Sequence, residues 1–283
     1  MNLPKSRPSF PATMPSTAHT KTKAVQVQTA QVKLAQAKPG TIKNSATTAL
    51  FQRATVQKSI LSSGIGLDSH AMRQRMVDKL AAQGISDPAL LQAMNTVERH
   101  RFVDTALVGQ AYEDTSLPIG LGQTISKPNV VARMIELLRQ GCAKDSKGRI
   151  GRVLEIGTGC GYQAALLAQV CTEVYSIERL RGLHDKARDN LRPFAIAHLS
   201  LLLGDGMLGY AKGAPFAGII AAAGGDAIPQ AWVDQLAVGG RLVAPVVTTG
   251  KTQALIVLDK TQLGVTQSVL EAVHFVPLKS GVM

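Results

Sequence analysis

The sequence predicts an α/β fold, in which a mainly parallel seven-stranded sheet carries helices on both faces and ends in an antiparallel edge. The first observation behind this prediction is the apolar run of Val153, Leu154 and Ile156, which a glycine-rich turn and an apolar helix over 164–168 follow. A strand, turn and helix of this kind form the first half of a βαβ unit. The second observation is that apolar runs and helical segments alternate up to residue 246, before two final apolar runs.

The glycine turn narrows the kind of ligand that this unit would hold. Gly157, Gly159 and Gly161 stand at alternate positions, and Tyr162 occupies the place where a dinucleotide-binding G-x-G-x-x-G motif has its last glycine. Glycine leaves room for a ligand to approach the main chain closely. With Glu155 in the preceding strand, the pattern is similar to motif I of the class I methyltransferases that bind S-adenosylmethionine (AdoMet). A purely structural turn is the alternative, because any tight connection can use glycines.

Charge divides the chain of 283 residues into two parts. Its net charge is +12, but residues 1–67 contain nine Lys or Arg and no acidic residue, which leaves a net charge of only +3 on residues 68–283. The first part is rich in Thr, Ala, Gln, Ser, Lys and Pro, and it has too few large apolar residues to offset the entropy of ordering. We therefore expect a basic, disordered extension over 1–67 and one folded domain over 68–283.

Three interpretations of the extension stay open. It is a solvated extension or a gene start placed too far upstream, an organelle transit peptide, or an electrostatic tether to nucleic acid or an acidic surface. The sequence has no secretory apolar segment and no apolar run of about 18 residues that would span a membrane. Cys142, Cys160 and Cys171 are odd in number and lack C-x-x-C spacing, so we expect no disulfide framework, no metal site and a reducing, cytoplasmic location.

Two helices and an unusual loop precede the glycine turn. Asp68 is expected to cap a helix that stops near Gly84, and Asp87-Pro88 opens a second helix. The segment 111–128 has many hydroxyls and several Gly and Pro residues but no sustained period, which indicates an ordered, functional loop. The alternative is a connector in which Ser126 merely caps the helix that runs from residue 129 to 138.

Acidic residues end the next two strands. Glu178 ends the strand over 173–178 and lies 21 residues after Gly157, close to the spacing of about 20 for a carboxylate that binds ribose hydroxyls. An exposed acid at a strand end is the alternative. Asp205, between Gly204 and Gly206 after the run at 201–203, is placed to accept from an adenine amine. The remaining elements are expected as strands over 216–223, 241–246, 254–258 and 271–278, with a helix over 228–236.

Several segments together resemble one enzyme family. They are Leu117–Gly120, Gly122–Pro128 with its G-Q-T-I-S-x-P pattern, Val153–Gln163, Gly204–Gly206 and Phe275–Leu278. From about residue 68 onward the chain resembles protein-L-isoaspartate O-methyltransferases, which use AdoMet to methylate the α-carboxyl of isoaspartyl residues and so initiate repair through a succinimide. The resemblance implies Ser126 as the active-site hydroxyl. It implies a cofactor site formed by Thr124, Ile125, Glu155, Gly157, Thr158, Gly159, Gly161, Glu178, Gly204, Asp205 and Ala222.

One segment departs from the family. Bacterial members tend to carry T-A-A and a proline-containing turn after the fourth strand, whereas this chain has Ala221–Asp226 with Gly224 and Gly225. Two glycines predict a more flexible loop, which would alter peptide affinity and makes the place of Ala222 beside the cofactor less secure.

Three other functions are compatible with parts of this sequence. Another class I methyltransferase would share the cofactor site but act on a small molecule or RNA, and the Ser126 loop argues against it. A second alternative is a non-catalytic protein of the same fold that binds nucleic acid through its basic extension. A third is a dinucleotide oxidoreductase, and Tyr162 in the glycine pattern argues against it. We expect a monomer whose partners are isoaspartyl peptides and proteins, with no specific nucleic acid and no membrane. A carboxylate acceptor is already ionised at pH 7, so the reaction needs alignment rather than a strong base.

Overall fold

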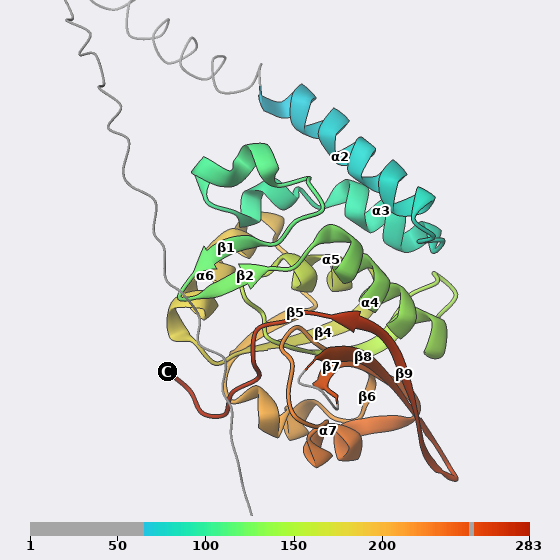
Figure 1. Cartoon of the computed structure of the whole chain (residues 1–283). Helices are drawn as coiled ribbons and strands as arrows, with labels where there is room; N and C mark the ends of the chain where they lie inside the picture. Colours follow the sequence, from blue (N-terminus) through green and yellow to red (C-terminus); the bar gives the residue numbers. More distant parts are fainter. Residues whose placement is uncertain (1–64, 249–251) are drawn as a thin grey trace, which may run out of the picture. The chain divides into compact units, whose positions relative to one another are not determined.

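The computed structural model describes residues 65–248 and 252–283, which contain a seven-stranded sheet (Figure 1). The strands lie in the order β5-β4-β3-β6-β7-β8-β9. Their bounds are β3 (Ile150–Ile156), β4 (Cys171–Glu178), β5 (Leu199–Leu203), β6 (Phe216–Ala221), β7 (Leu236–Val247), β8 (Gln253–Thr261) and β9 (Gly264–Val273). The five strands β3 to β7 are parallel to one another. Strand β8 pairs antiparallel with β7, and β9 pairs antiparallel with β8. The predicted sheet is confirmed. Residues 1–64 of the predicted extension lie outside the described residues.

The strand order creates a switch point at β3. From β3 the chain moves outward through β4 to β5, and then returns to place β6 on the other side of β3. Ligands of open α/β sheets bind beyond the carboxyl ends of the strands at such a point. The topology therefore directs attention to the residues that follow Ile156, Glu178 and Ala221.

Helices cover both faces of the sheet, as predicted. Side chains of β3 alternate between the faces, so that Val153 joins one apolar core while Leu154 and Ile156 join the other. The first core includes α4 (Pro128–Gly141), α5 (Tyr162–Val170) and α6 (Arg181–Leu191), and the second includes Trp232 of α7 (Gln230–Gln235). Short 3₁₀ helices lie between these elements: η1 (Arg99–Phe102), η2 (Thr105–Gln110), η3 (Arg192–Phe194), η4 (Gly206–Leu208) and η5 (Ala211–Gly213).

Two N-terminal helices form a further layer. Helix α2 (Ile65–Ala82) packs on α3 (Pro88–Thr96), and α3 in turn packs on α4 and α5. The prediction that Asp68 caps the first helix is wrong, because that helix has already begun at Ile65. The start of the second helix is confirmed: Asp87 caps α3 and Pro88 takes its first position.

Three local predictions differ from the structure. The segment expected to lack regular structure contains an antiparallel hairpin, β1 (Leu117–Gly120) and β2 (Gln123–Ile125). Its tip is tight because Gly120, Leu121 and Gly122 all have positive φ, at 98°, 52° and 69°. The fifth long strand begins at Leu236, where a helix end was expected. The last strand ends at Val273, so residues 275–278 follow the sheet rather than belong to it.

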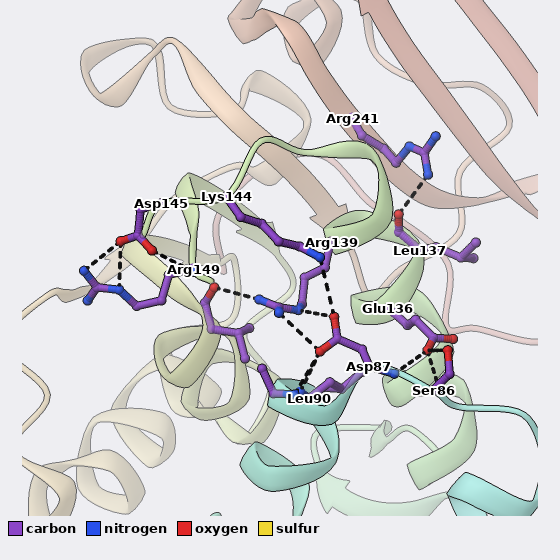
Figure 2. Close-up of polar contacts among 12 residues, drawn as sticks. Ser86, Asp87, Leu90, Glu136, Leu137, Arg139, Lys144, Asp145, Arg149 and Arg241 are labelled. Atoms are coloured by element: carbon purple, nitrogen blue, oxygen red, sulfur yellow. Dashed lines mark hydrogen bonds and ion pairs between the residues drawn. The ribbon is translucent and has the colours of Figure 1, made fainter. Parts of the chain in front are cut away.

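A buried ion pair joins α3 to α4 (Figure 2). The Asp87 carboxylate accepts from the N–H groups of Ala89 and Leu90 at 3.0 and 3.1 Å, and from Arg139 Nε at 2.8 Å. Arg139 is almost fully buried, and its Nη1 donates to Val170 O at 3.1 Å. Burial alone would raise the pKa of Asp87, but the bonds from Arg139 and from Leu90 N–H hold it below its ordinary value. One carboxylate thus caps a helix and neutralises a buried cation.

Within the described residues, no helix is both long and apolar enough to cross a membrane.

Replacing Asp87 by Asn should lower the free energy of unfolding by about 2–4 kcal/mol, because it leaves the Arg139 guanidinium buried without its counter-charge. Urea denaturation followed by circular dichroism measures this loss. The matched control is Asp145→Asn, since Asp145 forms an ion pair on an exposed turn, where Arg149 Nε and Nη2 both donate to its Oδ2 (Figure 2). Exposed pairs contribute little, so the control should unfold like the wild type. Equal losses in both variants would contradict the role of Arg139.

Candidate active site

A cavity of about 480 Å³ lies beyond the carboxyl ends of β3, β4 and β6. Its wall is formed by the β1–β2 hairpin, the turn after β3, the turn after β4 and the C-terminal segment. Eight of the residues that the sequence selected line it: Thr124, Ile125, Ser126, Gly157, Thr158, Gly159, Glu178 and Ala222. The other four do not reach the wall: Glu155, Gly161, Gly204 and Asp205. The structure thus gathers residues from 124 to 222 around one space at the switch point.

The turn after β3 has a left-handed backbone at each of its glycines. The φ angles of Gly157, Gly159 and Gly161 are 91°, 56° and 91°, which L-residues with a Cβ rarely adopt. A Cβ on Gly161 would also lie 2.8 Å from Leu191 Cδ1 of α6. Gly157 and Gly159 therefore present bare main chain to the cavity, while Gly161 lets α5 pack closely against α6.

Glu178 connects the ends of β3 and β4. Its carboxylate accepts from Gly159 N at 2.9 Å through Oε2 and from Leu180 N at 2.9 Å through Oε1. A carboxylate oxygen has two lone pairs, so each oxygen keeps one for a ligand. The main chain after it is held by Gly204, whose N–H donates to Glu178 O at 2.9 Å. The carboxylate both shapes the glycine turn and remains able to accept from hydroxyl groups in the cavity.

Glu155 lies behind the glycine turn and is fully buried. Ser176 Oγ donates to its Oε2, and Thr158 Oγ1 lies 2.6 Å from Ser176 Oγ. Either of the Thr158 and Ser176 hydroxyls can donate to the other. Burial raises the pKa of Glu155 to about 8, against the opposing effect of the Ser176 bond. Burial thus favours the protonated acid at neutral pH, and Glu155 reaches the turn through Ser176 and Thr158.

Asp205 precedes Gly206 of the cavity wall, and its carboxylate accepts from main-chain donors. Its Oδ1 accepts from Met207 N at 2.9 Å, and its Oδ2 accepts from Gly281 N at 2.7 Å. The C-terminal segment is held further where Met283 N donates to Arg179 O at 2.9 Å. Lys279 and Met283 line the cavity beside Gly206. The sequence pattern selected Phe275–Leu278, but it missed Lys279 and Met283, which belong to no recognisable motif.

The Ser126 loop is positioned by groups that precede it in the chain. Ser126 is half-buried on the cavity wall, and its carbonyl oxygen accepts from Arg99 Nη2 at 2.7 Å. Helix α4 is capped at Lys127 without a side-chain bond, and the free N–H of Asn129 is satisfied by Asp114 Oδ1 at 2.9 Å. The alternative in which Ser126 caps the helix is therefore wrong, and its hydroxyl is available for another role.

The glycine pair after β6 is held on both sides. Gly224 N donates to Val276 O at 2.8 Å and Gly224 O accepts from Leu278 N at 2.8 Å, while Gly225 N donates to Pro245 O at 3.3 Å. A Cβ on Gly224 would lie 2.5 Å from the side-chain nitrogen of Gln253. The expected loop flexibility is thus opposed by main-chain pairing, which brings residues 276–278 to the cavity.

In the part of the chain that the structure describes, no group of three His, Cys, Asp or Glu side chains is arranged to hold a metal ion. The three cysteines are free and buried.

Replacing Glu155 by Gln should flatten the pH dependence of stability. Folding raises the pKa of Glu155 from 4.5 to about 8, so the folded protein holds a proton that the unfolded chain releases. Stability from this group is therefore complete below about pH 4.5 and is lost as the pH rises toward about 8. The amide variant cannot titrate. Urea denaturation across this range compares the two proteins, and parallel pH profiles would contradict the protonated state of Glu155.

The sequence is similar to a known enzyme family over the whole region that forms this cavity. A family model described as Protein-L-isoaspartate(D-aspartate) O-methyltransferase (PCMT) matches residues 71–283. The protein-L-isoaspartate O-methyltransferase of Methylibium petroleiphilum is 57% identical over 235 residues, covering 82% of this chain and 86% of the relative. That of Leptothrix cholodnii is 58% identical over 231 residues, covering 81% and 80%.

Solved structures agree with the sequence relatives. A protein-L-isoaspartate O-methyltransferase shares 26% identity and a TM-score of 0.66, over 74% of this chain and 67% of that chain. A structure described as a candidate enzyme of the same kind from Plasmodium falciparum, in complex with S-adenosyl-L-homocysteine, has a TM-score of 0.60 at 24% identity, over 73% and 98%, and supports the fold. With the match over residues 71–283, these findings confirm the resemblance noted in the sequence, and the chain belongs to the protein-L-isoaspartate(D-aspartate) O-methyltransferase family.

Proposed function

We propose that this chain transfers the methyl group of AdoMet to the α-carboxyl of L-isoaspartyl residues in damaged proteins. The methyl ester re-closes to a succinimide, which can reopen to normal aspartate, so methylation initiates repair. One observation carries this proposal. The family match over residues 71–283 includes every wall of the cavity, from the Ser126 hairpin through the glycine turn to the C-terminal segment.

The cavity fits a cofactor of the size and polarity of AdoMet. Its volume of about 480 Å³ is in the range of small-molecule sites, which is about 300–1,000 Å³. Gly157 and Gly159 offer main chain without a Cβ, and Glu178 offers one free lone pair on each carboxylate oxygen. Two adjacent ribose hydroxyls are donors that match this pair of acceptors.

The predicted cofactor residues divide into two groups by their position. We propose direct contact for those on the wall: Thr124, Ile125, Gly157, Thr158, Gly159, Glu178 and Ala222. The four away from the wall support them. Glu155 and Gly161 hold the glycine turn from behind, Gly204 binds the main chain of Glu178, and Asp205 fixes Met207 and Gly281 at the adenine end. The contact of Asp205 with the adenine amine stays a prediction, because Asp205 does not line the cavity.

The chemistry depends on alignment. When bound, AdoMet supplies a methyl group on a positively charged sulfur. The acceptor carboxylate is ionised at neutral pH, so the chain supplies no general base. The Ser126 hydroxyl, on the wall between the hairpin and α4, donates to one oxygen of that carboxylate and holds the other oxygen toward the methyl group. A neutral donor suits this role, because a lysine there would stabilise the unreacted carboxylate too strongly.

The location, oligomeric state and partners of the enzyme form a further part of the proposal. We propose that it acts as a cytoplasmic monomer on isoaspartyl peptides and proteins, without a specific nucleic acid and apart from membranes. The low net charge of residues 68–283 and the free, buried state of the three cysteines support this setting.

Methyl transfer to paired synthetic peptides tests the function. Radiolabelled AdoMet should give base-labile label on a peptide with L-isoaspartate and none on the same peptide with L-aspartate. The reason is that only the isomerised residue presents its α-carboxyl on the side chain. Scintillation counting before and after mild base measures the ester. Label on both peptides, or on neither, would contradict the proposed substrate and direct the search to another methyl acceptor.

Replacing Ser126 by Ala should lower kcat/KM for the isoaspartyl peptide by roughly 10- to 100-fold, because a hydrogen bond to a charged group contributes about 1.5–3 kcal/mol. Steady-state kinetics at saturating AdoMet measure the loss. Ser116→Ala is the matched control, since Ser116 is an exposed serine of the same segment that does not line the cavity. Full turnover by the Ser126 variant would remove this hydroxyl from the mechanism.

A further inference from the structure

Arg99 is a fully buried cation directly behind the Ser126 loop. Its Nε donates to Ala111 O at 2.8 Å, and its Nη2 donates to Ser126 O at 2.7 Å. The carbon of its guanidinium lies 4.8 Å from the centre of the Tyr162 ring. The side chain thus joins three segments that are distant in sequence: the end of η2, the Ser126 loop and the first residue of α5.

The burial of Arg99 is costly for the fold. Burial lowers the pKa of its guanidinium, because removing a cation from water disfavours the charged form. Its two hydrogen bonds to main chain go to neutral carbonyl oxygens, and Tyr162 and Asp114 offset part of the cost of burial by raising the pKa of the guanidinium. Arg139 is almost as buried but donates to the Asp87 carboxylate, which compensates its charge. Arg99 donates to carbonyl oxygens rather than to a carboxylate, so it contributes less to the stability of the core than Arg139 does. Its position behind the Ser126 loop suggests an additional role.

Two of the three segments that Arg99 joins line the cavity. Ser126 stands on the side proposed for the peptide, and Tyr162 follows Gly161 at the end of the turn proposed for the cofactor. A guanidinium is a planar fork whose donors have a fixed spacing, so two carbonyls bound to it cannot shift independently. The Tyr162 ring is itself fixed, since its hydroxyl donates to Met94 Sδ at 3.7 Å.

We propose that Arg99 is a positioning residue, which fixes the main chain at Ser126 relative to Tyr162 so that the bound carboxylate lies in line with the methyl donor. This inference rests on the proposed function. It concerns a residue that touches neither the substrate nor the cofactor and acts through the Ser126 carbonyl.

The Arg99→Lys variant tests the positioning role. Lysine keeps the charge but lacks the fork, so it cannot hold both carbonyls in one geometry. Hydrogen exchange of residues 117–127, read by mass spectrometry, should become about tenfold faster or more, as expected for losing a hydrogen bond to a charged group. Calorimetry on protein saturated with S-adenosylhomocysteine should show weaker binding of the isoaspartyl peptide by a similar factor.

Affinity for S-adenosylhomocysteine supplies the internal reference. Trp232 is the one tryptophan of the chain, and its Nε1 donates to the O atom of Gly206, a residue on the cavity wall. Its fluorescence therefore reports binding of S-adenosylhomocysteine without turnover. The Arg99→Lys variant should lose less affinity for this molecule than for the peptide, because the glycine turn and Glu178 are unchanged and only Thr124 and Ile125 lie in the loosened segment.

Arg139→Lys is the matched control, since it makes the same change in a buried arginine outside the cavity. Both variants should lose thermal stability, but only Arg99→Lys should weaken peptide binding and speed exchange at 117–127. If Arg99→Lys lowers stability alone, or if both variants weaken peptide binding equally, the positioning role is overturned.

Methyl transfer by the wild type and hydrogen exchange in Arg99→Lys separate the proposed function from this inference. A wild-type protein that does not methylate the isoaspartyl peptide would overturn the function. Faster exchange at 117–127 in Arg99→Lys would still support the control of the loop by Arg99, and unchanged exchange would overturn it.

Discussion

The left-handed backbone of the turn after β3 is the constraint on which the rest of the site depends. Because Gly157 and Gly159 adopt positive φ, the N–H of Gly159 reaches the Glu178 carboxylate and joins the ends of two neighbouring strands. The same turn delivers Tyr162 into the core beneath the hairpin, where Arg99 contacts its ring. A side chain at either glycine would strain the backbone, and a Cβ on Gly159 would also lie 3.2 Å from Ile119 Cδ1 of the hairpin.

The enzyme is an AdoMet-dependent carboxyl methyltransferase whose cavity combines apolar side chains with the main chain of the glycine turn and the hydroxyls of Thr124, Ser126 and Thr158. Its ionisable side chains hold the scaffold: Glu178 binds two amides of the turns, Asp205 binds two more, and Glu155 lies buried and protonated below. This distribution suits a reaction whose nucleophile is already charged, since the chain has to orient two bound molecules rather than move a proton.

Much of the fold could be predicted from sequence because the responsible signals are local. The apolar run at 153–156 and the glycines after it identify β3 and its turn, and Asp87-Pro88 marks the start of α3. The signals that failed concern long-range pairing. No local pattern shows that the carbonyl of Ser126 accepts from Arg99, 27 residues earlier, or that Gly281 donates to Asp205, 76 residues away. Asp114 satisfies the helix start that Ser126 was free to cap, and this too depends on the tertiary fold.

The pairing of Gly224 and Gly225 limits which residues this loop accepts. Both glycines donate their N–H groups, to Val276 O and to Pro245 O. Proline has no N–H to donate, so neither position accepts it without the loss of a main-chain bond. A proline at Gly224 would break the bond that holds Val276, so an exchange in the loop after β6 would also loosen the C-terminal wall of the cavity.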